Sequence, residues 1–226
     1  MYDVMIDLEN LCVHPDGAIL TMAFVQFDIK TGQLGQELYL RIDRNKALKY
    51  GLASAATVAW WESQDPAARA EAYDGTLDPR DAARMVRDWF KRTFSKPPFV
   101  WGNGSCMDIV QLEYWLRRLA PEYNKRGDHT YPWNYWDIMD MRTIMRVAKL
   151  RMPKTRPSWV QHHNALHDAK YQIEWVVKAM AACRQPQQLA AIGQQLAAAR
   201  VPPVPGEPVR PPSPDDYSEY TQIIAD

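Results

Sequence analysis

The stretch MIDLEN, residues 5–10, carries two acids, Asp7 and Glu9, inside a run that otherwise has the composition of a buried strand. Side chains on a strand alternate between two faces, so residues two apart share a face. Both carboxylates therefore point the same way, and burying them without partners would cost free energy. Two interpretations are open: edge-of-sheet charges paired with Arg or Lys, or a site for a hard cation such as Mg²⁺ or Mn²⁺.

Short strands come first along the chain, and helical patterns follow. Residues 2–42 predict a three-stranded antiparallel start with a turn at Thr31-Gly32, and residues 97–104 predict a further strand. Asp78 and Ser105 are the expected caps of two of the helices. The predicted helices cover residues 54–64, 65–73, 78–94, 105–119, 139–150, 165–183 and 186–200. This order predicts an α/β fold in which helices pack on a sheet.

The composition is that of a soluble globular chain, with 46% hydrophobic and 24% charged residues among 226. No apolar run is long enough to cross a bilayer, so we expect no membrane association. The cysteines are three in number and contain no C-x-x-C pair, which predicts neither a disulfide framework nor a cysteine zinc site. A cytoplasmic location is expected, in the host cytoplasm if the protein is encoded by a phage.

The last 26 residues, 201–226, differ from the rest of the chain. They contain seven prolines, five acids and one base, a net charge of −4, so residues 1–200 carry +4. Such a composition has too little apolar surface to offset the entropy of ordering. We expect a disordered, Pro-rich acidic tail that could dock on a protein partner.

Two more acids stand in contexts that strengthen the cation interpretation. Asp108 lies in VWGNGSCMDIVQL, a strand, a glycine turn and a helix start, and Asp168 lies in HHNALHDAKYQ, five residues after His163. Alone, Asp108 would be a helix-start charge and Asp168 a solvated helix residue. Together, D-x-E, N-G-x-x-x-D and H-x-A-x-x-D-A occur in an order that resembles the DEDDh 3′–5′ exonuclease superfamily, the group of RNase T and the proofreading domains.

The resemblance covers residues 2–183 and implies a ribonuclease H-like mixed sheet flanked by helices. The motifs WGNGSCMD and TVAWWESQDPAAR are most similar to phage and bacterial exonucleases such as phage T4 exonuclease A and exonuclease VIII. Asn10 stands where Thr commonly follows the D-x-E pair, and Met107 stands where Phe commonly precedes the middle Asp. Neither departure removes a carboxylate. We therefore expect an exonuclease domain over 1–185, a C-terminal helix over 186–200 and the tail over 201–226.

The resemblance also implies the roles of the acids. Asp7, Glu9, Asp108 and Asp168 would hold two Mg²⁺ or Mn²⁺ ions, with Asp7 bridging them. Two cations about 3.5–4 Å apart can stabilise the attacking water, the phosphoryl oxygens and the leaving oxygen of a phosphodiester. His163 would be the base that takes the proton from water.

The spacing of the histidines bears on this role. Five residues of a helix turn by about 140°, so His163 and Asp168 cannot face one site from one straight helix, and we expect His163 on an exposed, mobile loop. His163 and His167 are four apart and could form a zinc pair, but Asn164 stands where the catalytic Glu of such an enzyme would be. His162 and His167 are expected at the surface or behind the site.

Substrate contacts are predicted from aromatic and amide side chains: Trp60, Trp61, Asn10 and Asn103. One tryptophan should fill the core, and the other could stack on a terminal base. The segment from residue 142 to 156 contains six basic residues and no acid. It is either a solvated helix face or a surface that follows phosphates.

These patterns predict a metal-dependent 3′–5′ exonuclease that acts on single-stranded DNA or RNA 3′ ends and releases nucleoside 5′-monophosphates. The alternative is a catalytically silent nucleic-acid-binding protein with the same fold. The presence of all four acids and the histidine favours the enzyme.

Overall fold

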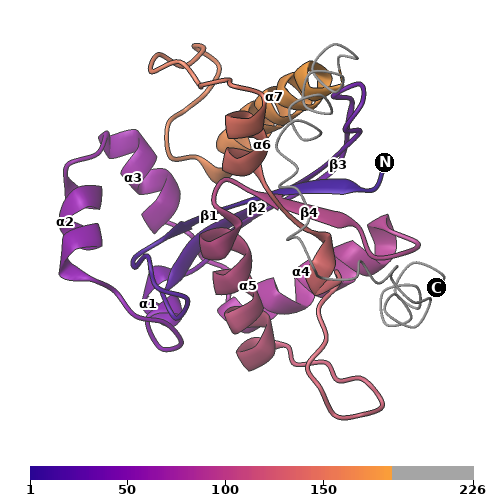
Figure 1. Ribbon diagram of the computed structural model, residues 1–226. Helices are drawn as coiled ribbons and strands as arrows, with labels where there is room; N and C mark the ends of the chain where they lie inside the picture. The colour runs from indigo at the N-terminus through magenta and orange to yellow at the C-terminus, as the bar shows by residue number, and fades with distance from the viewer. Residues whose placement is uncertain (185–226) are drawn as a thin grey trace, which may run out of the picture. The chain divides into compact units, whose positions relative to one another are not determined.

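A computed structural model describes residues 1–184 (Figure 1). The predicted helix over 186–200 and the predicted tail over 201–226 lie outside these residues. Within them, the chain forms one five-stranded sheet in the order β3-β2-β1-β4-β5. The strands are β1 (Asp3–Asn10), β2 (Ile19–Phe27), β3 (Leu34–Arg41), β4 (Phe99–Gly102) and β5 (Ile138–Asp140).

The sheet is mixed. β2 pairs antiparallel with both β1 and β3, whereas β4 pairs parallel with β1 and with β5. The predicted three-stranded antiparallel start and the α/β fold class are therefore confirmed. β1 is the central strand, so the two acids of its sequence lie in the middle of the sheet.

Helices cover both faces of the sheet (Figure 1). α6 and α7 lie on one face, α4 and α5 on the other, and α2 and α3 lie beyond one end of β1. The helices are α1 (Arg44–Ala47), α2 (Ala55–Glu62), α3 (Pro66–Tyr73), α4 (Pro79–Thr93), α5 (Ser105–Leu119), α6 (Met141–Val147) and α7 (Ala165–Cys183). This arrangement is the ribonuclease H-like sheet flanked by helices that the sequence predicts.

The alternation along β1 explains why its acids face α7. Val4, Ile6 and Leu8 belong to the core between the sheet and α4 and α5, whereas Met5 belongs to the core beneath α6 and α7. Residues two apart share a face, so the acids at 7 and 9 continue the row of Met5. The carboxylates therefore point toward α7.

Two local predictions need correction. The predicted helix over 139–150 is confirmed only for α6, because residues 139 and 140 belong to the short strand β5, and Asp140 at the junction accepts a hydrogen bond from the Thr143 amide at 2.8 Å. Ser105 does not cap α5, because the cap position is Gly104 with φ 101°, a conformation that favours glycine. The Ser105 amide instead donates to Asp140 Oδ2 at 2.8 Å. The cap at Asp78 is confirmed, with its carboxylate accepting from the Arg80 amide at 3.0 Å.

Among residues 1–184, no helix combines the length and hydrophobicity that crossing a membrane requires.

Candidate active site

Three secondary-structure elements bring the four predicted acids together. Asp7 and Glu9 come from β1, Asp108 from the first turn of α5 and Asp168 from the first turn of α7. Asp7, Asp108 and Asp168 are only 8%, 6% and 5% exposed, and Glu9 is half-buried. Buried acids without compensation are rare in proteins. Burial therefore excludes the interpretation of Asp168 as a solvated helix residue, and Asp108, although it lies at a helix start, belongs to the same group of acids.

Burial and mutual repulsion make this cluster unfavourable when all acids are ionised. Burial, then the negative charges of Asp108 and Glu9, raise the pKa of Asp7 well above its usual range. Burial and the charge of Asp108 raise the pKa of Glu9 to about 8. Burial also raises the pKa of Asp108 to about 7, although a backbone hydrogen bond at Leu8 and the charge of Arg142 lower it. The cluster is short of positive charge.

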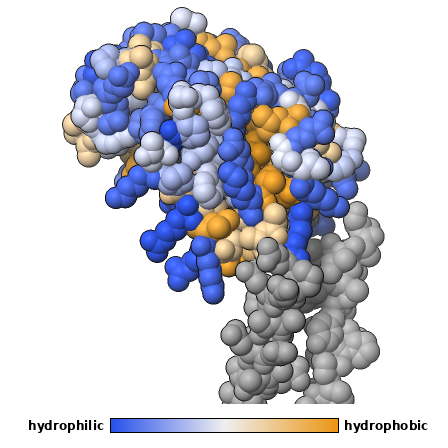
Figure 2. All heavy atoms as spheres, turned by 90° about the horizontal axis from the view of Figure 1, so that it is seen from above, coloured by the Kyte–Doolittle hydropathy of each residue, from blue (hydrophilic) through white to orange (hydrophobic). Residues whose placement is uncertain are grey.

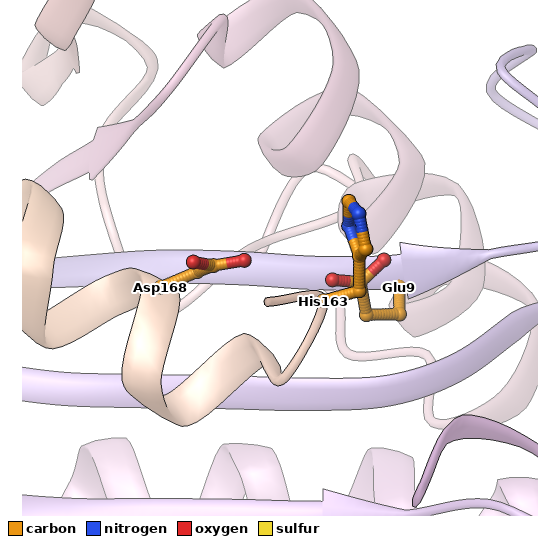
Figure 3. Close-up of side chains that lie close together, drawn as sticks. All are labelled: Glu9, His163 and Asp168. Carbon is orange, nitrogen blue, oxygen red and sulfur yellow. The ribbon is translucent and has the colours of Figure 1, made fainter. Parts of the chain in front are cut away.

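A hard divalent cation suits this set of ligands. Carboxylate oxygens are the ligands that Mg²⁺ and Mn²⁺ prefer, and a cation would relieve the repulsion that raises the pKa values. Ligand atoms of Glu9, His163 and Asp168 all lie within 4.8 Å of one another, and Figure 3 shows the three side chains side by side. Asp7 and Asp108 lie outside this 4.8 Å group. The negative charge of Asp108 raises the pKa of Glu9, and the charge of Glu9 raises the pKa of Asp7.

Two neighbours of the acids were not identified from the sequence. Gln172 of α7 donates a hydrogen bond of 2.6 Å from Nε2 to Asp7 Oδ1. It follows Asp168 by four residues, so helix periodicity places both on the same face, which is a signal that the sequence contains. The Arg156 guanidinium forms an ion pair with Asp168 and lies over the ring of Tyr171. Nothing in the sequence pattern separates Arg156 from the other basic residues of its segment.

His163 lies on the loop before α7, as predicted, but its side chain is half-buried and the prediction of exposure is wrong. Its ring packs edge-to-face on Trp60 at 4.7 Å and on Trp61 at 6.0 Å between centroids. Its backbone has φ 60°, which is rare for a residue with a side chain. Burial, then the positive charges of His162 and Arg156, lower the pKa of His163, which favours the neutral ring, the form that can accept a proton.

Among the described residues, His162 and His167 belong to no group of potential metal ligands. His167 Nδ1 accepts a hydrogen bond of 3.1 Å from the Gln161 amide, so it is not free to pair with His163 on a zinc ion. His162 is exposed.

Trp60 and Trp61 lie in different environments. Trp61 is fully buried, and its Nε1 donates to the Asn10 carbonyl at 2.9 Å. Trp60 is 41% exposed and lines a pocket of about 450 Å³ that also contains Glu9, Asn10 and Met107. The pocket is mostly apolar and opens beside the carboxylates, so it has the composition needed to hold a base next to them.

The structure does not bring Asn103 into this pocket. Asn103 lies in the turn between β4 and α5, where its Oδ1 accepts a hydrogen bond of 3.2 Å from Arg142 Nε. It lines a separate groove with Arg142 and other residues of α6. Asn10 is the last residue of β1, is buried, and lines the pocket beside Trp60.

The environments of the tryptophans lead to a prediction. Trp60→Leu is expected to weaken binding of a short single strand by about 1–3 kcal/mol, because a stacking surface is lost, with little change in melting temperature. Trp61→Leu is expected to lower the melting temperature by many degrees, because it leaves a cavity and an unpaired Asn10 carbonyl. Thermal melts and equilibrium binding of both variants check this. Equal melting losses with unchanged binding would assign both residues to the core.

The raised pKa values predict how stability depends on pH without metal. Between about pH 6.5 and 8.5 the acids of an unfolded chain carry no protons, whereas the folded cluster still binds them, with pKa values of about 7 for Asp108 and about 8 for Glu9. Folding therefore takes up protons, and the free energy of unfolding falls as the pH rises through this range. Melting temperatures in chelator should decrease across it, and Mg²⁺ or Mn²⁺ should reverse the decrease. A melting temperature that rises with pH in chelator would contradict the electrostatic account.

The sheet and the convergent acids and histidine have the arrangement that the sequence motifs predict for a 3′–5′ exonuclease. The chain belongs to the Rv2179c-like 3′–5′ exoribonuclease domain family, whose model matches residues 2–180. The recognition of a 3′–5′ exonuclease from the sequence motifs is therefore confirmed, whereas the likeness to phage T4 exonuclease A and exonuclease VIII stays a prediction.

Solved structures of similar fold include exonuclease I of E. coli. A metal-free form of its complex with single-stranded DNA has a TM-score of 0.52 and 16% identity, covering 87% of this chain and 44% of that chain. The zinc-bound form has a TM-score of 0.53, with the same identity and coverage. The present chain thus spans less than half the length of exonuclease I. No curated protein matches its sequence.

Proposed function

We propose that this protein is a divalent-metal-dependent exonuclease that removes single nucleotides from the 3′ end of single-stranded RNA. The observation that carries the proposal is the convergence of buried, mutually repelling carboxylates with a half-buried histidine, beside an apolar pocket that Glu9 and Trp60 line. Such a combination of perturbed groups beside a pocket is typical of an active site.

The acids are proposed to hold the cations. Asp7, Glu9, Asp108 and Asp168 would provide oxygen ligands for two Mg²⁺ or Mn²⁺ ions. When bound, the ions would neutralise negative charge on the phosphoryl group and favour the hydroxide form of water. Gln172 would keep the Asp7 carboxylate in place through its 2.6 Å hydrogen bond.

His163 is proposed to act as general base. It takes a proton from the water that attacks the terminal phosphorus, and the bond from phosphorus to the 3′ oxygen of the preceding nucleotide breaks. That oxygen receives a proton from solvent and becomes the new 3′ hydroxyl, and a nucleoside 5′-monophosphate leaves. The neutral state of the half-buried ring suits the first step.

Trp60 and the pocket beside Glu9 would hold the terminal base by stacking, which tolerates every base. RNA is proposed as the substrate because the family to which the chain belongs is described as exoribonucleases. Single-stranded DNA is the second candidate, favoured by the likeness in fold to exonuclease I in complex with it. A cytoplasmic location and a partner for residues 201–226 stay predictions from sequence.

The test compares single-stranded RNA and DNA of equal sequence, each labelled at the 5′ end, in Mg²⁺, in Mn²⁺ and in chelator. The proposal expects a ladder of shortened RNA with either metal, nucleoside 5′-monophosphates as products and no reaction in chelator. Stronger digestion of DNA would reverse the substrate assignment. Binding without cleavage under all conditions would favour the alternative, a catalytically silent binding protein.

A further inference from the structure

A second concave surface lies next to the active site and is built from different residues. It is a groove of about 810 Å³ bordered by α6, by the segment after α6 and by Asn103 in the β4–α5 turn. Seen from the side on which α6 and α7 lie, the surface is hydrophilic with exposed hydrophobic patches between the polar side chains (Figure 2). The lining of the groove likewise contains both charged and apolar side chains.

Positive charge dominates this groove. Its lining includes four cations and no acid, and within residues 1–184 none of the four forms an ion pair with a carboxylate. The cations are Arg142, Arg146, Lys149 and Arg151. All four are exposed, and the apolar part of the lining consists of Met141, Met145, Leu150 and Met152. Unpaired cations over an apolar surface suit a ligand that is both anionic and rich in flat apolar groups.

The backbone at the end of α6 holds one of these cations in a strained position. Lys149 has φ 56°. Its amide donates to the Arg146 carbonyl at 3.1 Å, and the next amide, of Leu150, donates to the Met145 carbonyl at 2.9 Å. This is the hydrogen-bond pattern that usually ends a helix with glycine at the position of Lys149. A lysine there costs folding free energy relative to glycine.

Arg142 connects the groove to the active site. Its Nε donates to Asn103 Oδ1 at 3.2 Å, and a Cβ at the neighbouring Gly104 would lie 3.1 Å from its Cζ. The charge of Arg142 also acts on Asp108, the proposed cation ligand of α5. A strand bound along the cations would therefore arrive beside the carboxylates.

We propose that this groove binds the phosphates of the single-stranded nucleic acid that lie on the 5′ side of the terminal nucleotide. The inference rests on the proposed function and adds the path of the strand to it. Arg142 meets the phosphates nearest the site, and Arg146, Lys149 and Arg151 meet those further along, with bases lying on the methionine and leucine side chains. The net charge of +4 over residues 1–200 fits a short path of this kind and not a long duplex groove.

The test uses the full chain in chelator, so that binding is measured without cleavage. Lys149→Gly removes a charge and also restores the usual residue at that backbone position, so its melting temperature should not fall. Arg146→Gln removes a second charge from the same groove. The matched control is Lys125→Gly, an exposed lysine beyond the C-terminal end of α5. The groove lies at the N-terminal end of α5, which has 15 residues and is therefore about 22 Å long.

Affinity for a longer oligoribonucleotide is measured against salt for each variant, with a dinucleotide as reference. Each groove variant is expected to bind the longer strand about fivefold more weakly near 0.1 M salt and to reduce the slope of log K against log salt by about 0.7. The affinity advantage of the longer strand over the dinucleotide should shrink accordingly. The Lys125→Gly control should match the unchanged protein.

The outcomes separate this inference from the proposed function. If both groove variants keep the affinity and salt slope of the unchanged protein, and the protein digests RNA, the proposed groove binding is refuted. The proposed exonuclease function then stands. If the protein never cleaves RNA but the groove variants show the expected losses of affinity, groove binding is supported and the exonuclease function is refuted. Tighter RNA binding by Lys149→Gly would overturn the path as well, because loss of a phosphate contact cannot strengthen binding.

Discussion

Asp108→Asn is expected to lower turnover by orders of magnitude while the fold is retained. The substitution keeps the size of the side chain and removes one anionic ligand from the proposed cation site. The same change removes a buried negative charge whose pKa burial has raised to about 7. In chelator near pH 8 the variant should therefore melt at a higher temperature than the unchanged protein, because the repulsion within the cluster is smaller.

Loss of activity together with a gain in metal-free stability is a combination that simple damage to the fold would not produce. Turnover at saturating Mg²⁺ and melting in chelator are the two measurements. Asp88→Asn is the matched control, since Asp88 is an exposed residue of α4 and not one of the clustered acids, and the change should alter neither measurement. Near-normal turnover in Asp108→Asn would refute its assignment as a ligand.

His163→Ala is expected to reduce kcat by roughly 10²–10⁴-fold, the usual contribution of a general base. Metal binding measured by calorimetry and affinity for RNA in chelator should persist, because the acids and the groove are intact. His163→Asn is a useful second variant, since asparagine tolerates the positive φ of this position and preserves the loop.

His162→Ala provides the control, because His162 is exposed and adjacent in sequence. It should keep nearly full kcat. The ring of His163 lies with Glu9 and Asp168 in one group of potential ligand atoms (Figure 3). Calorimetric loss of metal binding in the His163 variants would therefore make this residue a ligand and not a base.

Much of the fold followed from patterns of sufficient length. β1, β2 and β3 each have eight or nine residues, and α4, α5 and α7 have 15 to 19, so their periodicity was readable. The four acids were recognisable because Asp7 and Glu9 share the D-x-E motif of β1, and Asp108 and Asp168 each lie in the first turn of a helix with a motif of its own. Their convergence could be anticipated from the order of the motifs.

The failures involve features that the local sequence does not specify. β5 has three residues, too few for alternation to distinguish it from the helix that follows. The burial of His163 depends on Trp60 and Trp61, which precede it by about a hundred positions in the sequence. The ion pair of Arg156 with Asp168 depends on how the loop before α7 folds back, and no local motif encodes that path.

The order of the proposed site along the chain bears on how the enzyme is made. A ribosome synthesises β1 with Asp7 and Glu9 first, and it reaches His163 and Asp168 only when α7 begins. Because the proposed centre needs residues from both β1 and α7, the emerging chain does not yet hold all of its proposed ligands while it is among ribosomal RNA and messenger RNA. The position of α7 as the last helix of the described chain thus delays nuclease activity until synthesis of residues 1–184 is nearly finished.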